Sequence, residues 1–520
     1  MAERYSDRPH PLIVGVATEV GRPDDPNAPD AVGWMTRAAE AALADATAAD
    51  DRPGSTAPTA MLAERIGWVG VAEGTWRCSD AGAVIADRLG LGGGHAVHTL
   101  RADVGIVQQR LVAEACGAIQ RGDTDAALVV GGEARARDRA IRGRGDEPSE
   151  TAGPDGAEPD EVIHPAGELM SDLELERDLA TPATQYAIVE DALAHAVGLD
   201  RTALRRRLGE LWSGFAAVAA ERPTAWDRSA PSATEIVSTD GGNRMVADPY
   251  TRSLCSQWNV DAASALVLMS TEVADRLGIA RRRRIAVEAT VESNLILPLP
   301  ERDQLHRWPA FEAVVEALAA HCGVPVAGGL DADVVDLYAC FPSAVQVQAR
   351  TLGLPLDAPA LTATGGMTFA GGPLNNAALG SMVAVVERLR HPASTGRSAR
   401  GLMTSISGML TKPGAMMLST APAAAPFAAL DVTDSATVRS RVLAVDPALA
   451  GEAVIAGATV IITFEGIRRA VAVVETTAVR GARRRSVATS DRDLVASSIS
   501  ELGGAGRAVT LDGVGGFEFR

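Results

Sequence analysis

The chain has 520 residues, 47% of them apolar, and a formal net charge of −17 at pH 7. A single core stops growing well below this length, so we expect about two to four domains. The negative charge disfavours nucleic acid and anionic membranes as main partners, because binding to both depends on Lys and Arg. No apolar run is long enough to span a bilayer.

Strands and helices are predicted to alternate through the first quarter of the chain. Residues 11–20 form a short apolar run typical of a buried strand. Residues 30–46 repeat apolar side chains at helical spacing behind an Asp cap. Strand-like runs return at 65–75 and at 126–134. This alternation predicts βαβ units and a parallel sheet.

The amino-acid composition changes after residue 134. Residues 135–175 are rich in Gly, Pro and charges and have almost no apolar periodicity. This composition predicts an exposed or mobile excursion. Two helices are expected to follow, at 184–198 and 201–223, so we assign 135–245 as a loop and helical excursion from the first half of the chain.

The second part of the chain repeats the order of the first. A strand at 285–293 and another at 332–341 precede a glycine-containing turn and an amphipathic helix at 375–390. The repetition predicts two similar α/β halves, residues 1–260 and 261–420.

An Ala/Pro-rich linker near residue 421 leads into a segment with a different pattern. Residues 428–520 consist of short strand-like runs separated by turns, which predicts a small additional β domain. Its 11 basic and 11 acidic residues cancel, and nucleic-acid binding would also need more stacking aromatics than it has. The arginine-rich turn at 480–486 is either a solvated loop or a contact for an anion or a partner.

The cysteines and the N-terminus indicate a cytoplasmic protein. Residues 1–16 lack the layout of a signal peptide. The cysteines show no paired spacing, which indicates reduced thiols. They are Cys78, Cys116, Cys255, Cys322 and Cys340.

Lysine and histidine restrict the chemistry further. Lys412 is the only lysine, and its neighbours match neither a Schiff-base site nor a phosphate-binding loop. The eight histidines form no metal-ligand pattern, so we expect no metal.

Two segments of the second half carry candidate site residues. The glycine-rich loop at 362–380 has the form of an active-site mouth but contains no acid, base or thiol. Tyr338 and Cys340 lie two residues apart at a predicted strand end, on one face of the strand. Strand ends of this kind bind ligands in open α/β folds, although packing explains either residue as well.

These segments resemble the thiolase superfamily. The motifs are IVGVATEV, AIQRGDTDAALVVGGE, VADPYTRSLCSQWNVDAASALVLMS, DVVDLYACFPSA and GGMTFAGGP, in this order. They are similar to sterol-carrier-protein-type thiolases and, with the additional C-terminal domain, to the thiolase-like proteins of type 1, usually labelled acetyl-CoA acetyltransferases. The resemblance implies the layered α/β/α/β/α thiolase fold, a C-terminal barrel of the oligonucleotide/oligosaccharide-binding (OB) type and a place in lipid metabolism. It also implies coenzyme A or acyl-CoA as ligand, without a tightly bound cofactor.

The resemblance also locates the catalytic positions, and this sequence departs from the family at each of them. Thiolases use a cysteine nucleophile, an activating histidine and a second cysteine that moves a proton. The equivalent positions here are Gly105, Gly372 and Ile406. Losing groups that act as a unit lowers turnover by a factor on the order of 10⁶.

The strand-end motif and the glycine-rich loop supply the other residues that we expect to line the acyl-CoA pocket. Tyr338 takes the first position of the strand-end motif and is the one candidate catalytic residue. Cys340, Gly371 and Asn375 are the expected pocket residues.

Four functions remain open from the sequence. The first is an acyl-CoA-binding or scaffold protein without carbon–carbon bond chemistry. The second is an acyl-CoA lyase of the retro-aldolase kind that uses Tyr338, and the third is an acyltransferase with displaced catalytic residues. The fourth is an interaction protein that binds a protein partner through residues 428–520. We expect either a monomer or a homodimer, because thiolases usually dimerise but the additional domain could prevent it.

Overall fold

The structure is a computed structural model. It describes residues 10–520 apart from 23–24, 26, 49–58, 155, 392–397, 423–424, 463–465 and 477–482. Among the described residues, no helix is long and apolar enough to cross a membrane.

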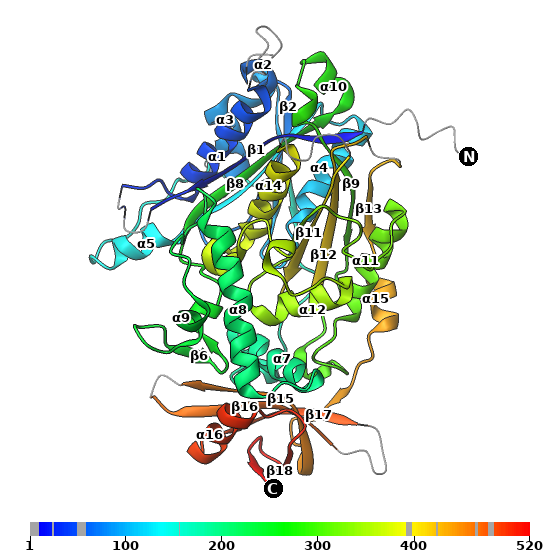
Figure 1. The fold of residues 1–520 in the computed structure, drawn as a ribbon. Coiled ribbons are helices and arrows are strands. Elements are labelled where there is room, and N and C mark those ends of the chain that lie inside the picture. The colour runs from blue at the N-terminus through cyan, green and yellow to red at the C-terminus, as the bar shows by residue number, and fades with distance from the viewer. Residues whose placement is uncertain are drawn as a thin grey trace.

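The first half of the chain forms one end of a large mixed sheet (Figure 1). Its strands lie in the order β1 (Pro11–Val20), β8 (Asp261–Ser270), β4 (Ala126–Ala134), β2 (Ile66–Ala72) and β3 (His98–Ala102). β8 runs antiparallel to both of its neighbours, whereas β4, β2 and β3 are parallel. The parallel sheet expected from the sequence is therefore interrupted by one reversed strand. That strand follows directly after the boundary we expected at residue 260, yet it lies within the sheet of the first half.

The second half repeats this arrangement. The strands β9 (Ile285–Glu292), β12 (Lys412–Ser419), β11 (Arg400–Ser407) and β10 (Val334–Asp336) are neighbours, with β12 reversed as β8 is in the first half. A short antiparallel contact between β1 and β9, with Ile13 opposite Ile285, joins the halves into one sheet. The two repeated α/β halves predicted from the sequence are confirmed.

Two helices lie between the halves. α4 (Gln109–Arg121) packs on β4 and β2 of the first half and on β12 and β9 of the second, while α14 (Ala377–Arg390) packs on β8 and β11. α14 is apolar around most of its circumference, as expected of a helix covered on all sides. The outer faces are covered by α1 (Ala31–Thr47) and α3 (Ala81–Leu89) on one side and by α11 (Pro309–Cys322) on the other. The result is the layered α/β/α/β/α fold.

The excursion after β4 is more ordered than its composition predicts. It contains α5 (Arg135–Arg142), a short strand β5 (Glu161–Ile163) and α6 (Asp172–Glu176). β5 pairs in parallel with β3, with Arg101 opposite Val162, and so covers the outer edge of that strand. An edge strand with free N–H and C=O groups is a template for pairing with another chain, so β5 occupies the position where a second chain could add.

The later part of the excursion is helical, as expected. It comprises α7 (Pro182–Ala196), α8 (Arg201–Ala220) and α9 (Ala233–Val237), followed by the short strands β6 (Met245–Ala247) and β7 (Tyr250–Thr251). α7 carries buried residues on every face. It packs on α12 (Pro342–Leu352) of the second half and on the C-terminal domain.

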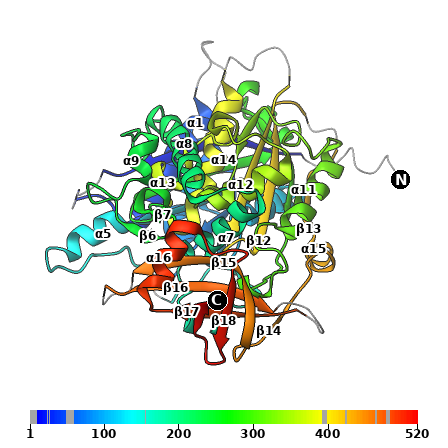
Figure 2. The ribbon, with the colours of Figure 1, turned by 60° about the horizontal axis from the view of Figure 1, so that its bottom comes forward.

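The C-terminal domain is a curled sheet below the layered core (Figure 2). Its strands lie in the order β14 (Ala444–Val445), β17 (Arg484–Ser490), β16 (Arg468–Thr476), β15 (Ala450–Ile462), β18 (Ala508–Asp512) and β19 (Phe517–Phe519). A bridge between Thr489 and Gly516 brings β17 back beside β19, so the sheet curls toward a barrel. One helix, α16 (Asp493–Leu502), packs on β16 and β15.

The linker between the core and this domain is partly structured. β13 (Ala428–Asp431) pairs with β9, and α15 (Thr433–Arg439) packs on α11. The chain that begins at 428 therefore first adds to the core and then enters the curled sheet near residue 444. The domain boundaries expected at residues 260, 420 and 428 remain predictions.

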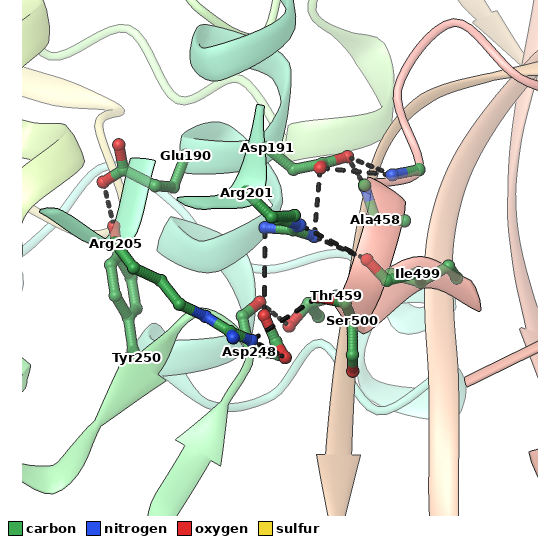
Figure 3. A network of polar contacts seen from close by, with 12 residues as sticks. Glu190, Asp191, Arg201, Arg205, Asp248, Tyr250, Ala458, Thr459, Ile499 and Ser500 are labelled. Atoms are coloured by element: carbon green, nitrogen blue, oxygen red, sulfur yellow. Dashed lines mark hydrogen bonds and ion pairs between the residues drawn. The ribbon is translucent and has the colours of Figure 1, made fainter. Parts of the chain in front are cut away.

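A buried ionic network attaches the C-terminal domain to α7 and α8 (Figure 3). The Asp191 carboxylate accepts hydrogen bonds from the backbone N–H groups of Ala458 at 3.0 Å and Ala505 at 2.8 Å, and from Gly504 at 3.2 Å. It also pairs with Arg201 at 3.2 Å, and the Arg201 guanidinium donates to the carbonyl of Ile499 at 3.1 Å. Both charged side chains are buried.

Asp248 extends the network on the other side of Arg201 (Figure 3). Its carboxylate lies 3.3 Å from Arg205 and 3.8 Å from Arg201. Its backbone N–H donates to the carbonyl of Val460 on β15, and its carbonyl accepts from the side-chain hydroxyl of Thr459. The domain is thus fixed by charged side chains and by a short backbone contact with β15.

We expect Asp191→Ala to destabilise the whole chain. The variant leaves Arg201 with one fewer partner and removes the acceptor of three buried N–H groups. Breaking a buried pair in this way costs about 3–5 kcal/mol. Urea unfolding of the full chain measures the loss, and Asp146→Ala, at an exposed carboxylate of the excursion, should stay within about 0.5 kcal/mol of the parent. A loss below about 1 kcal/mol for Asp191→Ala would show that the network does not hold the domain in place.

Candidate functional site

The two buried helices begin at the same place. Gln108 caps the start of α4, and its side-chain N–H donates to Oδ1 of Asn375 at 2.7 Å, directly before α14. The two residues are 267 positions apart in the chain. The segments that precede the two buried helices therefore meet at one junction between the halves.

Gly105 lies in the turn before α4 and is closed off by the excursion. Its φ of +106° is in the region that favours glycine. A Cβ at this position would lie 3.1 Å from Cβ of Pro165 and 4.0 Å from a methyl of Leu169. A side chain at Gly105, the position predicted for the nucleophile, would therefore require Pro165 to shift slightly.

Lys412, for which the sequence suggested no role, lies against this turn. It is fully buried at the start of β12, and its ammonium donates to the backbone carbonyl of Gly105. Burial lowers the pKa of Lys412, and the nearby carboxylate of Glu292 opposes that shift. No sequence motif could reveal this contact, because 307 residues separate its partners.

Gly372, the position of the activating histidine, is enclosed as well. Its N–H donates to the carbonyl of Gln257 at 2.8 Å. A Cβ there would lie 3.0 Å from Cβ of Met367 and 3.5 Å from the Gln257 carbonyl oxygen. Any larger side chain at this position requires Met367 to move. The preceding Gly371 has a φ of +97° and turns the loop back toward α14.

Ile406, the position of the second cysteine, is part of the apolar core of the second half. The adjacent Ser405 donates to Oε1 of Gln109 at the start of α4. A hydroxyl and an amide thus lie beside the position predicted for the second cysteine.

A small polar cavity lies beside the glycine-rich loop. Its volume is about 60 Å³. Among the residues that line it are Thr18, Ser264, Tyr338, Gly371, Asn376 and Thr404. Of the expected site residues, Tyr338 and Gly371 line this cavity, whereas Cys340, Asn375, Gly105, Gly372 and Ile406 do not.

Asn376 is the cavity residue whose hydrogen-bonding capacity is unused. It is 2% exposed, and neither its side-chain oxygen nor its nitrogen has a partner among the described residues. An unpaired buried polar group costs about 1–3 kcal/mol, so a ligand that both donates and accepts would be stabilised here.

Asp336 fixes the loop that forms the cavity wall. Its Oδ1 accepts from the backbone N–H groups of Ala363 at 2.6 Å and Thr364 at 3.0 Å and from the hydroxyl of Thr362 at 2.9 Å. Its Oδ2 accepts from Ser381 on α14. This residue was not among the candidates from the sequence, although an Asp at the end of a predicted strand and two residues before Tyr338 was a usable signal.

Tyr338 and Cys340 are poor acids at neutral pH. Burial raises the pKa of the Tyr338 hydroxyl well above its ordinary value, and Cys340 adds to the shift. Burial also raises the pKa of Cys340 to about 12. Burial thus disfavours the anionic form of both groups, and with it a role as base or nucleophile.

A second buried polar cluster packs against the segment 338–341 that follows β10. Glu190 on α7 accepts from the hydroxyl of Tyr250 and from the amide of Gln346, both at 2.7 Å (Figure 3 shows the first of these contacts). The Tyr250 ring stacks on Phe341 with ring centres 5.6 Å apart. Burial raises the pKa of Glu190 to about 7.

The repeated strand order, the two reversed strands and the paired central helices define a thiolase-like fold. Structural comparison agrees: the chain is similar to a monomeric SCP2-thiolase-like protein type 1 from Mycobacterium smegmatis, with a TM-score of 0.77 and 22% identity over 98% of this chain and 99% of that chain. This match includes the C-terminal domain, since it spans nearly the whole sequence.

Two further solved structures share the core. One is an acetyl-CoA acetyltransferase from Syntrophomonas wolfei, with a TM-score of 0.52 and 16% identity over 80% of this chain and 100% of that chain. The other is the Ltp2–ChsH2(DUF35) aldolase, with a TM-score of 0.56 and 17% identity over 79% of this chain and 98% of that chain. No protein-family model and no curated protein matches the sequence.

We expect Gly105→Ala to be more destabilising than an ordinary left-handed Gly→Ala exchange. The methyl group meets Pro165 in addition to the unfavourable φ. Gly122→Ala is the matched control, because Gly122 has a φ of +76° and no atom lies within 4 Å of the place its Cβ would take. Strain in this region costs about 1–3 kcal/mol, and crowding should add about 1 kcal/mol or more. If urea unfolding shows the same loss of unfolding free energy for both variants, then Pro165 moves aside easily and the excursion does not close off residue 105.

We expect Glu190→Gln to change the pH dependence of stability. The pKa of Glu190 is about 7 in the folded chain and takes its ordinary value of 4.5 in the unfolded chain. Between pH 4.5 and 7, Glu190 is therefore protonated when the chain is folded and ionised when it is unfolded. The stability that Glu190 contributes is therefore fully present below pH 4.5 and is lost as the pH rises through 7. At about 1.4 kcal/mol per pH unit, the parent should lose about 3 kcal/mol relative to the Gln variant across this range. Unfolding free energies measured from pH 4.5 to 8 check this, and parallel curves for parent and variant would contradict it.

Proposed function

We propose that the chain is an acyl-CoA-binding protein of the thiolase-like fold that lacks thiolase activity. The proposal rests on the difference between the cavity and the two glycine positions at the junction of the halves. A cavity lies beside the glycine-rich loop, whereas the positions predicted for the nucleophile and the activating base are glycines that Pro165 and Met367 crowd.

Acyl transfer to an enzyme group needs a nucleophile with a nearby base. The candidate thiol at Cys340 has a raised pKa and does not line the cavity. The ammonium of Lys412 is bound to the Gly105 carbonyl. The residues around the junction can therefore bind and orient a ligand, but no described pair forms a nucleophile with its base.

The cavity favours a short acyl group. A volume of about 60 Å³ has room for a few heavy atoms only. The amide of Asn376 and the hydroxyl of Tyr338 would hydrogen-bond a thioester carbonyl, while the rest of the coenzyme would lie outside the cavity. The similarity to an acetyl-CoA acetyltransferase supports this ligand class.

The other functions open from the sequence receive less support. A lyase that uses Tyr338 as a base requires a lowered pKa, and the pKa of Tyr338 is raised. The buried network at Asp191 fixes the C-terminal domain to the core, and binding of a protein partner through residues 428–520 stays a prediction.

We extend the proposal to assembly and location. We infer a monomer, because β5 covers the edge of β3 and the similar SCP2-thiolase-like protein is monomeric. We further propose that the curled C-terminal sheet is an OB-type barrel and that the protein acts in the cytoplasm on intermediates of lipid metabolism.

Binding and turnover assays on the full chain test the proposal. We expect acetyl-CoA to bind in calorimetric titrations and acetoacetyl-CoA to remain uncleaved in the presence of CoA. Asn376→Leu should weaken acetyl-CoA binding about tenfold, because it removes the unpaired amide. The control Tyr186→Phe removes a buried, unpartnered hydroxyl outside the cavity and should leave binding unchanged. Robust thiolysis, or no binding of acetyl-CoA, would refute the proposal.

A further inference from the structure

A second and larger cavity lies where the core meets the linker to the C-terminal domain. Its volume is about 340 Å³, and it shares no lining residue with the cavity beside the glycine-rich loop. Its walls come from the segment after β9, the start of α11, the turn between β11 and β12, and the residues that follow α15. Its lining includes Arg302, Arg307, Trp308, Leu410, Arg439 and Arg441.

Arg302 is a buried cation that the carboxylates of Glu174 and Glu301 influence without a direct ion pair. It is 7% exposed, and its guanidinium donates only to backbone carbonyls, to Leu297 at 3.0 Å and to Met409 at 2.6 Å. Among the described residues, no carboxylate lies within ion-pairing distance of it, and its Nη1 has no hydrogen-bond partner. Burying a charge is unfavourable unless a counter-charge compensates for it, so this position is suited to an anion.

Trp308 supplies a second unused donor on the same cavity. It is 4% exposed, and its indole Nε1 has no hydrogen-bond partner in the described part of the chain. Its ring is held in place by stacking on Phe311, with ring centres 5.3 Å apart. A buried indole N–H normally has an acceptor, and the cavity is the space from which one can come.

The remaining charges at the rim leave a positive excess. Arg307 pairs with Glu312 at 2.7 Å, and Arg439 pairs with Glu316 at 2.5 Å. Asp303 pairs with Arg483. Arg441 is exposed at the rim and forms no ion pair with a described residue. The groups left free at this cavity are therefore donors and cations, and the acids there are already paired.

The rest of the wall is apolar. Leu295, Leu297, Pro309, Ala310 and Leu410 line it together with the Trp308 ring. We propose that this cavity binds a small molecule that carries a carboxylate or phosphate group on an apolar body. The anionic group lies between Arg302 and the Trp308 N–H, and the apolar body lies against the leucine side chains.

The C-terminal domain contributes to the shape of this site. Arg485 on β17 is buried and donates to the carbonyls of Arg302 and of Asp303, the latter at 2.8 Å. The N–H of Leu443 donates to the carbonyl of Glu301 at 2.8 Å. The backbone that carries Arg302 is thus fixed by the domain, and a bound anion stabilises the contact between domain and core.

Calorimetric titration of the full chain with three probes tests the proposal. The probes are hexanoate, hexyl phosphate and inorganic phosphate, which separate a carboxylate, a phosphate on an apolar body and a free phosphate. We expect saturable binding of at least one of the two amphiphilic probes, more tightly than of inorganic phosphate. Trp308→Phe keeps an aromatic side chain but removes the donor and part of the ring volume, and the loss of the donor should weaken binding about tenfold. Arg302→Met should abolish binding.

Trp34→Phe is the matched control. Trp34 is also buried, and its indole N–H also lacks a partner among the described residues, but it lies on α1 and does not line this cavity. If Arg302→Met fails to fold, Trp308→Phe alone decides the question. The proposal is wrong if neither amphiphilic probe binds, if the two tryptophan variants lose binding equally, or if Trp308→Phe weakens acetyl-CoA binding to the same extent, since the two cavities would then be one site.

Discussion

The arrangement of the two halves depends on the junction at which the two buried helices, α4 and α14, begin. The contact between Gln108 and Asn375 places the start of α4 and the start of α14 side by side between the two halves of the sheet. A thiolase-like fold builds its site from repeated halves only if both helices point their N-terminal ends at one space. In this chain amides, hydroxyls and the ammonium of Lys412 lie around that space, and they form hydrogen bonds with one another and with the backbone.

The filling of the junction is cooperative across distant segments. Gly105 has no side chain, and Pro165 and Leu169 of the excursion lie against it. Gly372 has no side chain, and Met367 lies against it. A side chain at Gly105 would therefore meet Pro165 of the excursion, and a side chain at Gly372 would meet Met367 of the same loop. The small cavity that remains has the unpaired amide of Asn376 as its main polar feature.

The helix α7 connects this region with the C-terminal domain. Two consecutive residues face opposite ways: Glu190 contacts Tyr250 and Gln346 behind the strand-end motif, and Asp191 accepts backbone N–H groups of the domain (Figure 3). The added domain therefore lies against the helix that supports the site. The second cavity, at Arg302, lies on the same boundary between domain and core.

The sequence by itself determined the two α/β halves and the additional β domain, because periodicity and motif order are local properties, and the loss of the thiolase catalytic residues stays a prediction from the resemblance. It did not determine the reversed strands β8 and β12, the pairing of β5 with β3, or the roles of Asp336, Lys412 and Arg302. These features depend on which distant segments meet: Lys412 contacts Gly105 across 307 residues, and Arg302 is unpaired because the folded chain buries it with no described carboxylate at ion-pairing distance. Burial and long-range contact set the pKa values and the unused donors of this protein, and both exist only in the tertiary structure.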